Sequence, residues 1–279
     1  MESNQKIWRT FNNNKAAVVG LVVAVVIVAI AFFAKWIAPY DPLGQDVYNR
    51  LAQPSMSHLI GTDEYGRDVL SRIIWATQIS LAVGFFSIMI GLMIGTTIGV
   101  IAAYAGGKIE MFIMRMVDVL LSFPTLITGI MVAAILGSGL LKLIIAIGIV
   151  FTPRFARMAY GPTLSVKEKD YINASVVVGA GHFRIFKRHI LPNIIGDVIV
   201  AGSLWMGTAI MTETSLSFLG LGVSPPTPTW GNMIRTGIDQ LGHAPWLSIF
   251  PGLAILITVL AFNMIGDGLR DITDPKLRA

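Results

Sequence analysis

The sequence contains no cysteine. This absence excludes disulfide bonds, thiol catalysis and a cysteine-ligated zinc site, and it leaves the redox environment of the chain undetermined. No His-Glu-x-x-His zinc pattern is present either. Around Asp63, Glu64 and Asp68 the glycine and ligand spacing of an EF-hand calcium loop is missing. We therefore predict no metal site.

Charged residues are also scarce. They make up 13% of the 279 residues, whereas hydrophobic residues make up 54%. A soluble globular domain usually carries about 25% charged residues, so this is the composition of a membrane protein. The net charge of +5 fits Lys and Arg gathered in cytoplasmic loops better than it fits a nucleic-acid partner.

Motifs of membrane enzymes and ion-driven transporters are missing too. The phosphate-binding pattern G-x-x-x-x-G-K-[ST] is absent, because Ile109 follows Gly107-Lys108 and Ala102 stands where the first glycine belongs. The four histidines fall in predicted loops or at interfaces, which argues against a Ser/His pair for intramembrane proteolysis. No ionisable residue falls near the expected midplane of a span, where proton- or sodium-driven transporters usually place one. We expect the chain to be no enzyme and to bind no ATP or other cofactor itself.

Long uncharged stretches predict an all-α polytopic membrane protein with six transmembrane helices, each of about 20 residues. The predicted spans cover residues 16–38, 79–104, 114–136, 139–159, 194–219 and 246–268. We interpret the first as a retained anchor rather than a cleaved signal, since more spans follow it. The fourth has only 11 uncharged residues before Arg154 and Arg157, a length that also fits a re-entrant segment. We interpret it as a span, because the two basic segments on either side of it should both face the cytoplasm and an even number of crossings must separate them. Both arginine side chains would then extend to the inner interface.

The distribution of positive charge predicts the direction of the spans. Residues 154–188 carry seven Lys and Arg against Glu168 and Asp170, and the N-terminus carries Lys6, Arg9 and Lys15. Both segments should therefore face the cytoplasm. Six spans then place both termini and 15 of the 21 Lys and Arg residues on that side. Residues 160–192 form one large cytoplasmic loop in this prediction.

Small residues recur in that loop at a characteristic spacing. Asn173-Ala174-Ser175 is followed by Gly179 and then by Leu191-Pro192. This spacing resembles the coupling motif of ABC importer permeases, in which Glu-Ala-Ala precedes Gly and then Leu-Pro. A short helix with small residues on one side can seat in a groove of a partner, and the glycine lets the chain turn into a second helix. Asn173 replaces the motif's glutamate, so a role for a carboxylate there does not carry over; such loops also occur as plain connectors.

Three further stretches support the resemblance. They run over residues 58–72, 213–231 and 250–276, and they look like signatures of the C-type permease subunit of dipeptide and oligopeptide ABC importers. The likeness extends from about Lys15 to Arg278, which implies a single type I ABC importer transmembrane domain over residues 1–279. It also implies an ATPase-coupling loop made of Tyr171, Asn173, Ala174, Ser175, Gly179, Ala180, Gly181, Leu191 and Pro192.

The resemblance implies partners as well. These are a homologous second permease subunit, two ATPase subunits that bind ATP and magnesium, and an extracytoplasmic peptide-binding protein, all at a bacterial cytoplasmic membrane. The implied cargo is dipeptides or short oligopeptides. Nickel chelates, glutathione and antimicrobial peptides remain alternatives within the family, and a stand-alone channel remains one outside it.

Three polar residues are candidates for the outer mouth of a pathway. Glu213 lies about 28 Å along the fifth span from Ile194, so it should reach the outer interface either as a gate residue or as a carboxylate satisfied by neighbours. Asp63 and Arg67 precede the second span. They fit either substrate contact or a turn that caps a helix.

Overall fold

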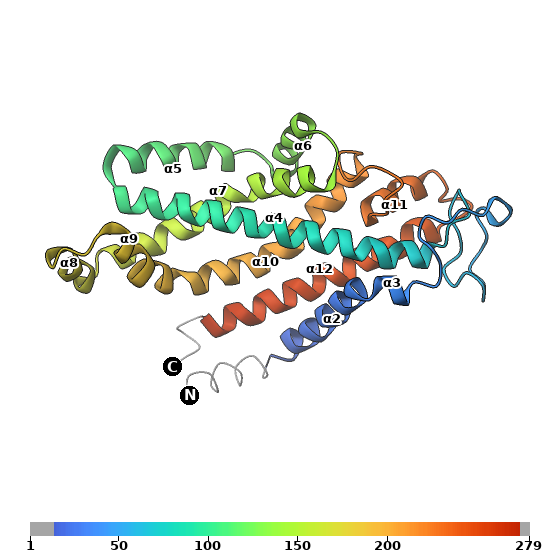
Figure 1. The fold of residues 1–279 in the computed structure, drawn as a ribbon, viewed down its shortest axis with the longest axis horizontal. Coiled ribbons are helices and arrows are strands. Elements are labelled where there is room, and N and C mark those ends of the chain that lie inside the picture. Colours follow the sequence, from blue (N-terminus) through green and yellow to red (C-terminus); the bar gives the residue numbers. More distant parts are fainter. Residues whose placement is uncertain (1–13, 274–279) are drawn as a thin grey trace.

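The computed structural model describes residues 14–273, and these residues form helices and loops without a β-strand. The helices lie in an elongated bundle, with α8 and α9 at one end and the loop between α3 and α4 at the other (Figure 1). The fold is all-α, as the sequence predicts. The ends of the chain, with Lys6, Arg9 and the Asp274-Pro275-Lys276 stretch, lie outside the described residues.

The described residues form eleven α-helices and two short turns of other helical types. The bounds are α2 Lys15–Phe32, α3 Ala34–Ile37, α4 Val69–Ala105, α5 Gly107–Leu121, α6 Thr125–Leu136, α7 Leu140–Lys167, α8 Asp170–Val177, α9 His182–Ile185, α10 Leu191–Phe218, α11 Trp230–Ile238 and α12 Trp246–Thr273. A short 3₁₀ turn, η1, covers Val47–Asn49, and a π-helical turn, η2, covers Phe186–Ile190 and joins α9 to α10.

The predicted third span is not one straight helix. Residues 114–136 fall on α5 and α6, which meet at an angle of 97°. The break contains Ser122, Phe123 and Pro124, and proline disfavours a helical conformation in the residue before it. Among the described residues, four helical stretches are long and apolar enough to cross a membrane, and α5 with α6 would make a fifth. The count of six crossings stays a prediction, because α7 is not among these stretches.

A ladder of glycines holds α4 against α7. Gly91, Gly95 and Gly99 recur every four residues on α4 and face α7; a Cβ on Gly95 would lie 2.6 Å from the Cβ of Phe155. The two backbones therefore approach more closely than any side chain would allow, as small residues permit in membrane helices. Phe151 and Phe155 are completely buried beside this contact.

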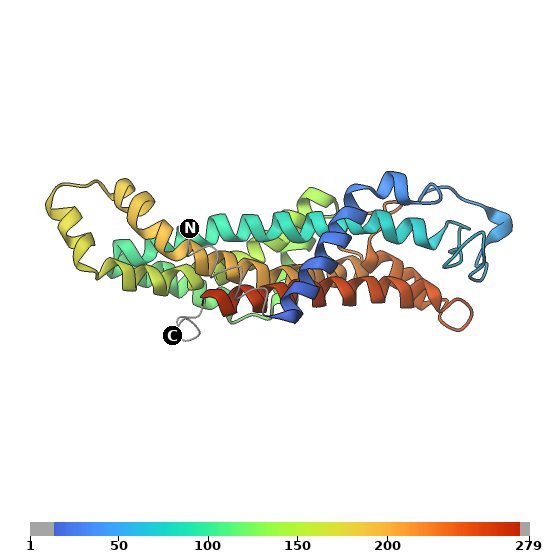
Figure 2. The same cartoon turned by 90° about the horizontal axis from the view of Figure 1, so that it is seen from below.

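The first and last described helices pack on each other. In the two views, α2 runs obliquely across the bundle beside α12 (Figures 1 and 2). Asn14, the N-cap of α2, donates a hydrogen bond of 2.8 Å from its side-chain amide to the Asp271 carboxylate. The beginning of α2 and the end of α12 are therefore on the same side of the bundle.

Candidate coupling and outer sites

The predicted coupling loop is a helical projection. Residues 160–167 continue α7, and α8 follows after a bend. Gly179 has φ of +80°, a conformation that side chains with a Cβ rarely adopt, and it turns the chain toward α9. The expected order of short helix, glycine turn and second helix is present.

The predicted coupling residues differ in their accessibility. Tyr171, Asn173, Ala174, Gly179, Gly181 and Pro192 are exposed, whereas Ser175, Ala180 and Leu191 are partly buried. The Ser175 hydroxyl donates to the Tyr171 carbonyl oxygen at 2.7 Å, so it satisfies its own helix. Ile172 and Ile185 are buried and attach the projection to the bundle. Ala174 is open to a partner, as its predicted role requires.

The most exposed apolar side chains of this end were not among the sequence candidates. We call Val176, Val177, Val178 and Phe183 the coupling tip. Val177, Val178 and Phe183 are 85%, 83% and 75% exposed. The signal in the sequence is a run of three valines in an otherwise polar segment. An apolar tip on a projection of this kind is typical of an interaction surface.

Two polar contacts tie the projection to the end of α4. The Lys167 ammonium donates to the carbonyl oxygens of Ala103 and Tyr104 at 3.0 and 2.9 Å. The Tyr104 hydroxyl lies 2.9 Å from Nδ1 of His182, and their rings meet edge to face. These contacts join α9 and the end of α7 to the end of α4.

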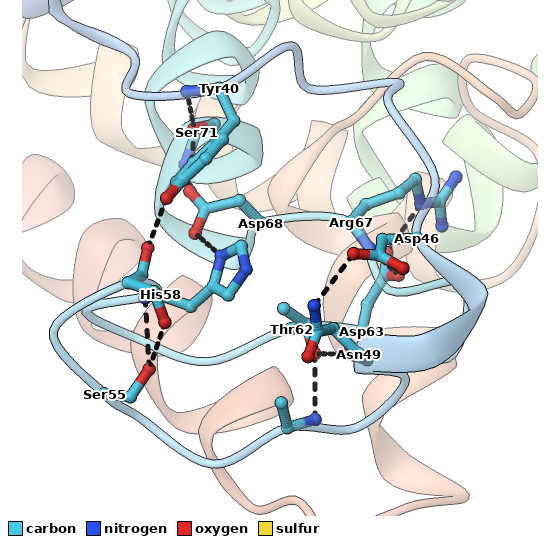
Figure 3. Close-up of polar contacts among 12 residues, drawn as sticks. Tyr40, Asp46, Asn49, Ser55, His58, Thr62, Asp63, Arg67, Asp68 and Ser71 are labelled. Atoms are coloured by element: carbon cyan, nitrogen blue, oxygen red, sulfur yellow. Dashed lines mark hydrogen bonds and ion pairs between the residues drawn. The ribbon is translucent and has the colours of Figure 1, made fainter.

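At the opposite end, Asp63 and Arg67 belong to an internal framework (Figure 3). Asp63 accepts hydrogen bonds from the backbone N–H of Tyr65 at 2.9 Å and of Arg67 at 3.0 Å, and from Arg67 Nε at 2.7 Å. Arg72 lies 3.4 Å from the same carboxylate. These residues are buried, so their geometry fits the turn reading rather than direct contact with a substrate.

The cap of α4 is Asp68. Its carboxylate accepts from the Ser71 N–H at 2.8 Å and from the Ser71 hydroxyl at 2.7 Å, and it lies 3.0 Å from Nδ1 of His58. Tyr40 stacks on the His58 ring and donates its backbone N–H to the Ser71 hydroxyl. The loop and the first turn of α4 are thereby joined into one unit.

Glu213 is completely buried between α10 and α4. Its carboxylate accepts hydrogen bonds from the Ser80 hydroxyl at 2.9 Å and the Ser217 hydroxyl at 2.7 Å. A carboxylate enclosed in this way does not face an open pathway in this conformation. Its neighbours satisfy it, which is the structural alternative that the sequence left open.

The two arginines of α7 have partners on α5 and α6. Arg157 forms an ion pair with Asp118 of α5, and Arg154 donates to the Thr125 hydroxyl at the start of α6. The Tyr160 hydroxyl donates to Glu110 of α5. The two arginines thus bind α7 to both sides of the α5–α6 break, and this explains how the charges are accommodated.

Comparison with known proteins decides the family. Residues 95–279 match the model of the binding-protein-dependent transport system inner membrane component. Residues 4–54 match the N-terminal transmembrane domain of oligopeptide transport permease C. The chain belongs to this family of ABC importer permeases.

Curated relatives agree with this assignment over the whole permease. It is 45% identical to the glutathione transport system permease protein GsiD of Pectobacterium atrosepticum over 99% of this chain and 92% of that protein. It is 43% identical to GsiD of Escherichia coli over 98% of this chain and 90% of that protein. The permease is therefore a multi-pass inner membrane component of a bacterial importer of the peptide family.

A solved structure confirms the fold of the permease. A chain of the inward-facing MetNI methionine ABC transporter superimposes with a TM-score of 0.59 at 20% identity, over 74% of this chain and 97% of that one. At this identity the likeness is one of architecture. It supports the type I ABC importer fold expected from the sequence.

Proposed function

We propose that this permease subunit moves short peptides, with glutathione as the first cargo to test, from a binding protein into the cytoplasm. The observation that carries the proposal is the 43–45% identity to glutathione permeases over nearly the whole chain. Glutathione is itself a tripeptide, so this cargo lies within the peptide class that the sequence predicts.

The family and the sequence indicate which other subunits the complete importer needs. The family is named for its dependence on a binding protein. Without a P-loop motif, the chain needs ATPase partners that supply ATP and magnesium. A second permease subunit completes the proposal, because a single bundle of this size does not easily enclose a path for a peptide.

The coupling tip gives the ATPases a place to act. Val177 and Phe183 project from the end of the bundle, and a groove on an ATPase would remove this apolar surface from water. Lys167 and His182 would pass the resulting movement to α4. The Asn14–Asp271 contact fits six crossings with both termini in the cytoplasm, because it places the beginning of α2 and the end of α12 on one side of the bundle.

The first experiment is to purify the subunit with its neighbours in mild detergent and to measure ATP hydrolysis with a glutathione-loaded binding protein. The proposal predicts that ATPase subunits co-purify and that the loaded protein stimulates hydrolysis. Dialanine and a nickel chelate serve as competing cargoes. Purification of the chain alone, with glutathione flux through liposomes that contain no ATPase, would instead establish a channel.

A substitution in the coupling segment sharpens this test. Ala174→Trp adds a large side chain at an exposed position, so the subunit itself should fold normally. The indole would overfill a partner's groove and abolish stimulated hydrolysis. Gly179→Glu is a poorer test, since the positive φ of Gly179 would strain any residue with a Cβ. Full stimulation of the Ala174→Trp complex would refute the assignment of this segment.

A further inference from the structure

The two arginines of α7 differ in what balances their charge. Arg157 forms an ion pair with Asp118 of α5. Arg154 forms no ion pair within the described residues 14–273, and its guanidinium donates to the neutral Thr125 hydroxyl instead. A guanidinium carries five N–H donors, so most of the hydrogen-bonding capacity of Arg154 is unused. Its positive charge is not compensated within this part of the chain.

Arg154 lies deep in the bundle. It is the fifteenth of the 28 residues of α7. At 1.5 Å per residue it is about 21 Å from Leu140, which is the end of the helix opposite the coupling projection. A hydrocarbon core of about 30 Å that begins at Leu140 would include this position. An ionisable side chain at such a depth is costly, and in membrane proteins it usually serves a function.

The unpaired guanidinium lies at a polar flank of the bundle, next to the break between α5 and α6. These two helices are on the side away from α2 and α12 (Figure 1). The side chains of the Arg157–Asp118 pair are 43% and 46% exposed there. Lipid chains do not solvate such charges, so this flank must face water or protein. In contrast, α2 has no charged residue after Lys15 and suits contact with lipid.

The surroundings of Arg154 suit a carboxylate. Its Cζ lies 5.3 Å from the centre of the Phe151 ring, and a guanidinium that stacks on a ring keeps its edge N–H groups free for two parallel bonds to a carboxylate. Thr125 is the first residue of α6, whose N-terminus has no side-chain cap. The positive end of this helix dipole adds to the field of the guanidinium.

We propose that Arg154 binds a carboxylate of the peptide cargo as the cargo passes between this subunit and a second permease subunit. Every peptide with a free C-terminus carries a carboxylate, and glutathione carries two. This inference rests on the proposed function, because it requires a path for a peptide along this flank. A lipid phosphate or a carboxylate of the second permease subunit would satisfy the same guanidinium, so the test must distinguish these sources.

The test uses the complete importer in proteoliposomes with its glutathione-loaded binding protein, and it measures the glutathione taken up per ATP hydrolysed. Arg154→Met removes the charge but keeps a long side chain. It should lower this ratio about tenfold, because a hydrogen bond to a charged group is lost. Arg154→Lys keeps the charge without the paired geometry and should restore part of the transport. Equal ratios for Arg154→Met and the wild type would overturn the proposal.

Thr125→Val is the matched control for a purely structural role of Arg154. It removes the hydroxyl that accepts from the guanidinium, but it keeps a similar shape and leaves the charge in place. The proposal expects the wild-type ratio in this variant. If Arg154 served only to hold α7 against α6, Thr125→Val would lower the ratio as much as Arg154→Met, and that result would also overturn the proposal.

A photocrosslinker in place of Phe123 identifies the occupant without any change to Arg154. Phe123 is 51% exposed in the break, two positions before Thr125. The importer is illuminated during turnover with radiolabelled glutathione in a bilayer that contains phosphatidylglycerol. An adduct with glutathione supports the proposal. Adducts only with the lipid, or only with the second permease subunit, overturn it because the anion then comes from a resident partner.

The wild-type importer separates this inference from the proposed function. If the wild type takes up no glutathione from the loaded binding protein, the proposed function fails for this cargo. If the wild type and Arg154→Met take it up equally well, the function stands and only the carboxylate site fails.

Discussion

Tyr104, in the last turn of α4, and His182, the first residue of α9, are joined at 2.9 Å through a hydroxyl and a ring nitrogen. They are 78 positions apart in the sequence. This contact connects the projection that carries the coupling tip with the helix that carries the outer loop. The contact therefore joins α4 directly to the projection.

Breaking this contact should reduce coupling without stopping ATP hydrolysis. In His182→Ala, loss of a hydrogen bond worth about 0.5–1.5 kcal/mol should lower the cargo moved per ATP about two- to tenfold. The measurement is glutathione uptake and phosphate release in the same proteoliposomes. His243→Ala, at an exposed histidine between α11 and α12, should leave the ratio unchanged; the same loss in both variants would contradict the role of the Tyr104–His182 contact.

A charge in the coupling tip should prevent assembly with the ATPases. Val177→Asp places a carboxylate where an apolar side chain is 85% exposed. The isolated subunit should keep its stability, but burial of the unpaired charge at an interface should abolish co-purification of the ATPase. Val177→Ile keeps the apolar character and should retain it. Undiminished co-purification with Val177→Asp would show that the tip is not buried in the complex.

A methyl group in the glycine ladder should separate α4 from α7. Gly95→Ala would place its Cβ 2.6 Å from that of Phe155, so the helices must shift at a cost of about 1–3 kcal/mol. Gly161→Ala is the matched control, because no atom lies within 4 Å of the added Cβ. Thermal unfolding in detergent should show a lower midpoint for Gly95→Ala only.

The buried carboxylate should depend on both of its donors. Ser80→Ala removes one hydrogen bond to Glu213 and should cost about 1–3 kcal/mol, because a buried acceptor is left partly unsatisfied. Ser215→Ala, on the same helix as Glu213, removes only an exposed bond to the Met211 carbonyl oxygen and should be nearly neutral. Indistinguishable unfolding midpoints would mean that the Ser80 bond contributes nothing to stability.

Apolar runs were sufficient to predict an all-α membrane protein, because lipid demands helices whose backbone bonds are satisfied internally. The positions of charge were harder to interpret. Arg154 and Arg157 suggested an interfacial end to the fourth span; in the structure α7 continues to Lys167, and Thr125 and Asp118 supply partners for the two arginines from other helices. The sequence could not reveal those partners, since they lie 29 and 39 positions away.

In the candidate sites too, features set by neighbouring residues could be predicted, whereas contacts between residues far apart in the sequence could not. The glycine turn at Gly179 follows from one residue, and the sequence predicted it. The coupling tip was missed because small residues, rather than the exposed valines, matched the family motif. Glu213 was placed at the outer interface from helix rise alone, and its hydrogen bond with Ser80, 133 positions away, could not be predicted in that way.

The length of α4 affects how the permease could open to one side of the membrane and then to the other. The helix has 37 residues and no internal proline, unlike α7 and α12, and so spans about 55 Å without a built-in hinge. A tilt of about 10° around its midpoint would displace each end by about 5 Å in opposite directions. Such a rigid tilt would close the permease at one end as it opens it at the other. Alternation between the two open states would then need no separate gate.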